Sequence, residues 1–174
     1  MNSKKSQSAL MAIEIAIQTE KDGREFYLGA AQKTSDPHGK ALFVSLAEDE
    51  LDHLRLLEGQ REALTKEHRW LPHTTRAEEE RPARFKGAPI FSREAPNQGL
   101  NVYTSELSAL RMAYLIEKDA VAFYSRAASE TDDPDGKAFY EYLVGMEKDH
   151  QRILEQEYSA LAKEFRTAMG FEPF

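Results

Sequence analysis

The sequence aligns with itself at one offset, and this internal repeat limits the possible folds more than any other feature. The offset carries the Glu-x-x-His of residues 50–53 onto that of residues 147–150, and the Asp-Pro of 36–37 onto that of 133–134. No gap is needed between these matches. Self-similarity over such a length indicates that one supersecondary unit occurs twice in the chain.

Each unit has the pattern of a helical hairpin. Apolar residues recur with the period of an α-helix on both sides of the Asp-Pro pair, in which aspartate is a favoured N-cap and proline a favoured first helical residue. The turn is therefore short and the two helices are antiparallel. We predict an all-α four-helix bundle with helices at about residues 6–33, 37–66, 105–131 and 134–166.

A crossover of about residues 67–104 joins the hairpins, which span about 6–66 and 105–166. It contains four prolines and no long amphipathic pattern. A helix of about 28 residues is roughly 42 Å long, and a connection of this length can run back along it. The second and third helices would then be parallel. The apolar residues expected to pin the crossover to the bundle are Trp70, Phe85, Ile90 and Phe91.

Composition limits the partners and the possible sites. The chain has 174 residues, which suits a single domain spanning residues 1–174. Its charged fraction of 30% and net charge of −7 argue against nucleic acid or an anionic membrane as a partner. Cysteine is absent, so disulfides, thiolate metal sites and cysteine nucleophiles are excluded. A metal would have to be held by oxygen and nitrogen.

The N-terminus does not have the pattern of a signal peptide. Lys4 and Lys5 precede an apolar run, but Glu14 interrupts it and no small-residue cleavage site follows. No other segment approaches the roughly 20 apolar residues that a membrane span needs. We therefore expect a cytoplasmic protein.

Acidic side chains lie on helix faces that should be apolar. Each predicted helix carries one glutamate at mid-length within its apolar stripe, and two of these glutamates are followed one turn later by a histidine. One such motif could arise by chance on the solvated face of an ordinary bundle, but two in register with two further glutamates are harder to attribute to it. The residues are Glu20, Glu50 with His53, Glu117, and Glu147 with His150.

Four converging carboxylates need compensating positive charge, because each buried charge costs several kcal/mol. Two divalent cations would cancel the four negative charges if both histidines stay neutral. Two ferric ions with an oxo bridge would cancel them equally well. One ligand set could therefore hold both oxidation states, which is a physical reason to expect redox chemistry.

On these residues the chain resembles the ferritin-like di-iron carboxylate superfamily, and within it the rubrerythrin-like proteins. The resemblance covers both hairpins and implies a ferritin-like four-helix bundle. It also implies a role for each residue: two bridging carboxylates, two terminal carboxylates, and one histidine for each metal. Carried over by position, these are Glu50 and Glu147, Glu20 and Glu117, and His53 and His150.

The resemblance further implies residues that contact the ligands. Tyrosines similar to Tyr27 and Tyr124 donate hydrogen bonds to bridging carboxylates, although both would also be ordinary as core residues. Asp49 stands where related bundles have an aspartate that accepts the N–H of the opposite histidine. Its counterpart in the second hairpin is Met146, so this feature is not duplicated.

The function implied is that of an oxidoreductase with two iron ions (Fe2+/Fe3+, oxo- or hydroxo-bridged) that reduces H2O2 or O2. Manganese or zinc could also bind. Full-length rubrerythrins add a rubredoxin domain with four cysteines, so here the electrons would come from a separate donor protein. We expect a homodimer or higher homo-oligomer. Rubrerythrins tend to have an extra glutamate where this chain has Ala120, which weakens the case for a specialised peroxidase.

Two alternatives stay open at this stage. The chain could be a ferroxidase for iron storage or detoxification, in which Fe(II) is the substrate. It could also be a non-catalytic bundle that a metal only stabilises. His38, His68 and His73 fall in turns or in the crossover and are expected at the surface. The tail Phe171–Phe174 could dock on a partner or on its own bundle.

Overall fold

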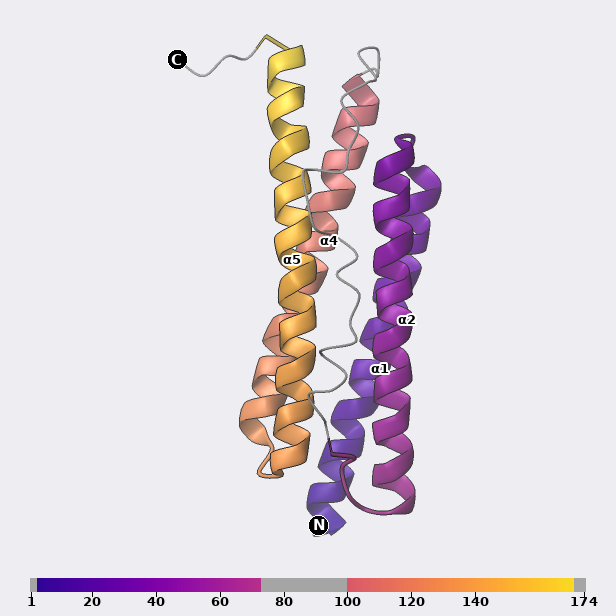
Figure 1. Cartoon of the computed structure of the whole chain (residues 1–174), viewed down its shortest axis with the longest axis vertical. Coiled ribbons are helices and arrows are strands. Elements are labelled where there is room, and N and C mark those ends of the chain that lie inside the picture. The colour runs from indigo at the N-terminus through magenta and orange to yellow at the C-terminus, as the bar shows by residue number, and fades with distance from the viewer. Residues whose placement is uncertain (1–2, 73–99, 171–174) are drawn as a thin grey trace.

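The computed structural model describes residues 3–72 and 100–170. This part of the chain forms the helices α1 (Ser3–Lys33), α2 (Pro37–Lys66), α4 (Leu100–Glu130) and α5 (Pro134–Ala168). Figure 1 shows the four helices side by side, with α2 and α4 running in the same direction and α1 and α5 in the other. The predicted all-α four-helix bundle is confirmed.

The helix limits differ little from those predicted. The two Asp-Pro turns start their helices as expected: Asp36 accepts a hydrogen bond from the Gly39 N–H at 2.7 Å, and Asp133 accepts from Asp135 N and Gly136 N. α4 begins at Leu100 instead of about 105, since residues 100–104 contain neither proline nor glycine to stop it. In the two described ranges, no helix is long and apolar enough to span a membrane.

The hairpins pack more closely within themselves than against each other. α1 lies along α2 and α4 along α5, while the contact between the hairpins is made chiefly by α1 and α4. The buried apolar residues form two clusters, one toward each end of the bundle. One includes Ile13, Ile17, Leu57, Tyr124, Tyr140 and Leu143. The other includes Tyr27, Phe43, Leu46, Leu110, Ala113 and Leu154.

A buried carboxylate joins the two hairpins at one end. Glu106 of α4 accepts hydrogen bonds from Ser35 N at 3.2 Å and Asp36 N at 3.3 Å, so it holds the turn between α1 and α2. Glu106 was not among the residues predicted from sequence. The signal was available, because Glu106 continues the stripe of Leu110, Ala113 and Glu117 at helical spacing.

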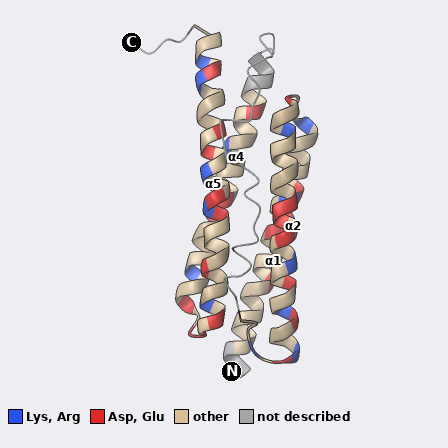
Figure 2. Cartoon of the chain, viewed as in Figure 1, with Lys and Arg blue, Asp and Glu red and all other residues tan. Residues whose placement is uncertain are grey.

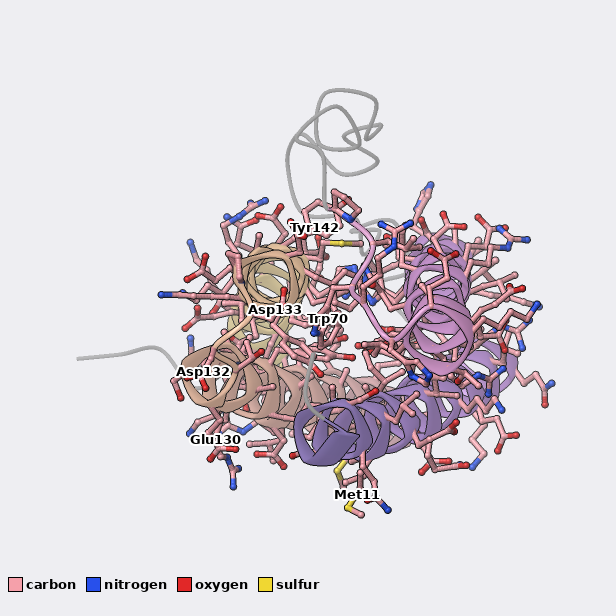
Figure 3. The ribbon with its side chains drawn as sticks, turned by 90° about the horizontal axis from the view of Figure 1, so that it is seen from below. Met11, Trp70, Glu130, Asp132, Asp133 and Tyr142 are labelled. Atoms are coloured by element: carbon pink, nitrogen blue, oxygen red, sulfur yellow. The ribbon has the colours of Figure 1, made fainter. Side chains whose placement is uncertain are left out.

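Trp70 packs against the other end of the bundle, as predicted for a residue that pins the start of the crossover. Its side chain is 2% exposed and lies between the helices when the bundle is viewed from below (Figure 3). The indole centroid is 6.0 Å from that of Phe139 and 5.4 Å from that of Tyr140. Gln60 fixes the adjoining backbone by accepting from Leu71 N at 2.9 Å and donating to Leu71 O at 3.1 Å. Phe85, Ile90 and Phe91 lie outside the described residues.

Gly136→Ala is expected to destabilise the protein, because an added Cβ would lie 2.6 Å from Trp70 Cε2. The rigid indole is fully buried, so the clash should cost about 1–3 kcal/mol and lower the Tm by roughly 2–4 °C per kcal/mol. Thermal melts followed by fluorescence would measure it, since Trp70 is the only tryptophan. Gly145→Ala is the matched control, because its added Cβ meets no atom within 4 Å. Equal melts for both variants would contradict the prediction.

Candidate metal centre

The four helices bring the six predicted side chains together at mid-length, between the two apolar clusters. Each of the six is between 0% and 3% exposed. Figure 2 shows acidic residues on α2 and α5 near the middle of the bundle. The side chains that meet are Glu20 of α1, Glu50 and His53 of α2, Glu117 of α4, and Glu147 and His150 of α5.

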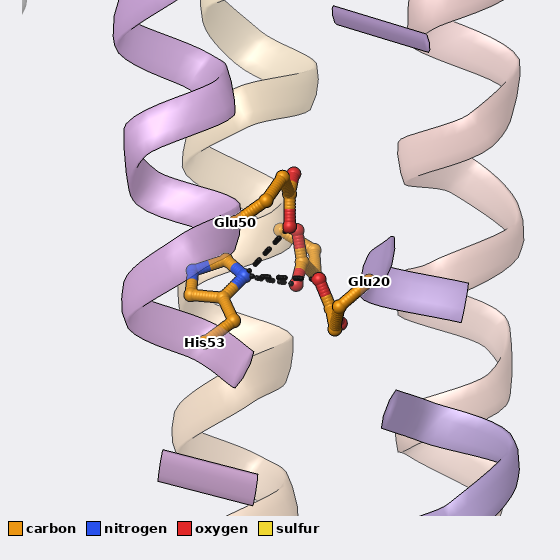
Figure 4. Close-up of side chains that lie close together, drawn as sticks. Glu20, Glu50 and His53 are labelled. Carbon is orange, nitrogen blue, oxygen red and sulfur yellow. Dashed lines mark hydrogen bonds and ion pairs between the residues drawn. The ribbon is translucent and has the colours of Figure 1, made fainter. Parts of the chain in front are cut away.

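The first group of ligating atoms surrounds His53. Its Nδ1 lies 3.1 Å from Glu50 Oε2, 3.3 Å from Glu20 Oε2 and 3.1 Å from Glu147 Oε1. Figure 4 shows Glu20 and Glu50 converging on the same ring nitrogen of His53. Three helices therefore contribute to this group.

The second group surrounds His150 in the same way. Its Nδ1 lies 3.3 Å from Glu147 Oε2, 3.4 Å from Glu117 Oε1 and 3.7 Å from Glu50 Oε1. Glu50 and Glu147 thus offer one oxygen to each histidine, while Glu20 faces only the first and Glu117 only the second. This is the arrangement expected of two bridging and two terminal carboxylates; their role as ligands stays a prediction.

Burial and mutual repulsion disturb the ionisation of the carboxyl groups. Burial raises the pKa of Glu117 to about 7, and nearby Glu147 adds to the effect. Burial also raises the pKa of Glu50 well above its usual value. For Glu147 burial would raise the pKa, but the two histidines outweigh it and hold the pKa well below its usual value.

The histidines show the complementary effect. Burial alone would lower their pKa, but Glu147 and Glu50 raise the pKa of His53 well above its usual value, and Glu117 does the same for His150. The metal-free group of six side chains therefore binds extra protons, which balance the charge of its carboxylates. Cations bound among the same atoms would take over that role.

The unsatisfied atoms of the cluster fit a metal. Both oxygens of Glu147 and both ring nitrogens of His150 are buried and lack a well-directed hydrogen bond, although the two groups approach closely. Buried polar atoms rarely stay unsatisfied without a functional reason. The unsatisfied atoms of Glu147 and His150 lie next to the other carboxylates of the group. Four carboxylates with two imidazoles suit two divalent ions such as iron or manganese.

A family model, Rubrerythrin, matches residues 11–158 of the sequence. The chain belongs to the rubrerythrin family. This is a ferritin-like di-iron family, and all six residues of the cluster lie within the matched range.

Comparison with solved structures supports the fold of this rubrerythrin-family chain. A hypothetical protein from Pyrococcus furiosus, Pfu-1136390-001, superposes with a TM-score of 0.65 at 23% identity, over 89% of this chain and 90% of its own. At this identity the likeness shows the fold alone. No curated protein matches the sequence.

The tyrosines contact the ligand cluster, but not at the carboxylates that the resemblance implied. Tyr27 of α1 donates a hydrogen bond to Glu117 of α4, and Tyr124 of α4 donates to Glu20 of α1. Both acceptors are the unshared glutamates instead of the shared ones, because α1 and α4 are the helices that meet between the hairpins. Burial and the adjacent carboxylates raise the pKa of both phenols, which keeps the donating protons in place.

Tyr27→Phe and Tyr124→Phe are each expected to weaken metal binding about tenfold while leaving the capacity of two ions per chain unchanged, since groups that orient ligands have effects of 10–100-fold. Isothermal titration of the metal-free protein with Mn2+ would measure this. Tyr114→Phe, on the same helix as Tyr124 but at a half-buried position away from the carboxylates, is the control. Unchanged affinity in both test variants would show that the hydrogen bonds do not position Glu20 and Glu117.

Asp49 lies beside the second group of ligating atoms. Its Oδ2 is 3.4 Å from His150 Nε2, the placement predicted from the resemblance. Among the described residues, the ion pairs of His53 all involve Nδ1, and its buried Nε2 has no carboxylate in the position that Asp49 takes at His150. His38 and His68 are exposed, as predicted, and His73 lies outside the described residues, as does the tail Phe171–Phe174.

Proposed function

We propose that this chain is a di-iron oxidoreductase that reduces H2O2 or O2. The observation that carries the proposal is the pair of ligand groups that share Glu50 and Glu147. When bound, two ferrous ions would supply two electrons, which together with two protons reduce H2O2 to two water molecules or O2 to H2O2. Family membership and an oxygen- and nitrogen-only donor set support iron as the metal.

The protein's own residues have separate tasks in this proposal. Glu50 and Glu147 would each contact both ions, Glu20 and Glu117 would each hold one ion, and each histidine would hold one ion. Tyr124 and Tyr27 keep the outer carboxylates in place by donating to Glu20 and Glu117. The two apolar clusters lie on either side of the six candidate ligands along the bundle axis and exclude water from them.

Charge balance supports a pair of divalent ions. Four carboxylates cancel two such ions if the histidines are neutral, so loading removes the protons that the metal-free cluster gathers. We further propose that the chain works in the cytoplasm as a homodimer or higher homo-oligomer and receives electrons from a separate donor protein.

Rapid mixing tests the proposal. The protein is loaded anaerobically with two Fe(II) per chain and mixed with H2O2 or with O2 in separate shots, and oxidation is followed by absorbance. Fast oxidation by either oxidant, recovered on re-reduction, is expected. Continued turnover of added Fe(II) with O2 would instead indicate a ferroxidase. A loaded protein that neither oxidant changes would leave a structural role for the metal. Glu141→Ala, at an exposed position of α5, is the control variant.

A further inference from the structure

We propose that the two ion positions of this centre differ in affinity, with the position at His150 binding its ion more tightly than the position at His53. The inference rests on the proposed function in one respect, namely that the cluster binds two cations. It concerns residues outside the six ligands.

The internal duplication supplies a built-in comparison between the two positions. Each histidine presents Nδ1 to one unshared glutamate and to one oxygen of each shared glutamate. Each unshared glutamate accepts a hydrogen bond from a tyrosine of the other hairpin. The two positions therefore have the same types of ligand and the same tyrosine contacts, and the clearest chemical difference between them lies in another residue.

That residue is Asp49, whose counterpart is Met146. Asp49 directly precedes Glu50 and reaches across the bundle to within 3.4 Å of His150 Nε2. Met146 directly precedes Glu147, is buried, and packs in the apolar cluster that also holds Leu54. A thioether is only a weak hydrogen-bond acceptor. Both Nε2 atoms are buried and lack a well-directed hydrogen bond, but His150 Nε2 has the Asp49 carboxylate at 3.4 Å, whereas the ion pairs of His53 within the described residues all involve its Nδ1.

The difference matters because a histidine that binds a cation through Nδ1 must carry its proton on Nε2. At His150 that N–H faces a carboxylate, which fixes the tautomer, orients the ring and increases the basicity of Nδ1. At His53 the same N–H is buried with no hydrogen-bond acceptor in the described part of the chain, and burying an unpaired donor is unfavourable. The His53 tautomer that binds a cation is therefore less stable than that of His150, and the affinity of the position at His53 is lower.

Single-histidine variants test the inference without the repulsion between two bound ions. His53→Ala leaves the position at His150, and His150→Ala leaves the position at His53. Each metal-free variant is titrated anaerobically with Co2+, by calorimetry and by the visible absorption of the bound ion. We expect His53→Ala to bind Co2+ about 10–100-fold more tightly than His150→Ala, the range reported for partners of metal-bound histidines. Equal affinities, or the reverse order, would overturn the inference.

The role of Asp49 is tested in the same two backgrounds. Asp49→Leu should weaken Co2+ binding about 10–100-fold in His53→Ala and leave His150→Ala unchanged. A merely structural role for Asp49 predicts equal losses in both. Met146→Asp should strengthen binding in His150→Ala alone. If that variant does not fold, as judged by circular dichroism of the metal-free protein, Met146→Asn supplies a neutral acceptor for the same measurement.

Metal titration of the wild type separates failure of the proposed function from failure of this inference. A wild-type protein that binds no Co2+ or Fe2+ would overturn both the proposed function and this inference. A wild type that binds two ions, with single-histidine variants of equal affinity, would overturn the inference and leave the proposed function intact.

Discussion

Glu147→Ala is expected to abolish binding of both ions, lowering the iron content from about two per chain to less than one. The reason is that Glu147 offers an oxygen to each histidine, at 3.1 Å from His53 Nδ1 and 3.3 Å from His150 Nδ1. Its removal breaks both ligand groups at once and leaves each histidine with only one of its two shared carboxylates. Glu20→Ala, by contrast, removes a ligand from the first group only and should leave about one ion.

The measurement is iron content after anaerobic loading and gel filtration, together with the circular dichroism of each variant. Glu141→Ala on α5 is the control, because its side chain is 60% exposed. The assignment of Glu147 as the shared ligand would be wrong if Glu147→Ala and Glu20→Ala retained the same amount of iron.

The second large effect concerns pH. We expect the metal-free protein to lose stability as pH rises from about 5 to 8, and the metal-loaded protein to gain stability relative to it over the same range. The folded pKa of Glu117 is about 7, against 4.5 when unperturbed, and the pKa of Glu50 is also raised. The folded state thus binds more protons than the unfolded state above pH 4.5, so stability falls as pH rises through that window.

The histidines act in the same direction. The pKa of His53 and of His150 is raised above 6.5, so their contribution is complete below that value and is lost as pH rises through the folded pKa. The lowered pKa of Glu147 acts oppositely, but its contribution is present above pH 4.5 and is lost only below it. The expected trend between pH 5 and 8 therefore keeps its sign.

Metal reverses the trend because its ligands must be deprotonated, so affinity rises with pH. At a free ion concentration about 100 times the Kd of each position, two bound ions would add roughly 5 kcal/mol, or about 10–20 °C in Tm for a chain of this size. Thermal melts at pH 5.5, 7 and 8 with EDTA or with Mn2+ would measure both trends. A metal-free protein that becomes more stable at pH 8 would contradict the protonated cluster.

The fold followed from the sequence because its signals are local. The Asp-Pro pairs place two helix starts, and the helical period places the four glutamates on buried faces. The offset of the repeat then makes the two Glu-x-x-His motifs equivalent. These three signals were enough to predict that the six side chains meet.

Contacts that depend on which helices are neighbours could not be predicted from local patterns. Tyr27 reaches Glu117 instead of a shared carboxylate, which depends on α1 packing against α4. The same holds for Glu106, whose partners lie in the turn of the other hairpin. The close packing of Trp70 against Gly136 likewise joins the crossover to a helix start far along the chain.

The modest contact between the two hairpins has a consequence for how bound ions act on the whole chain. Each group of candidate ligands takes residues from both hairpins, so a bound ion would connect Glu20 and Glu50 to Glu147, positions separated by the entire crossover. Cross-links that close long loops restrict the unfolded chain most. A bound ion would therefore act as a reversible cross-link between the two hairpins. If the backbone were cut between the hairpins, the ions would still hold the two halves together.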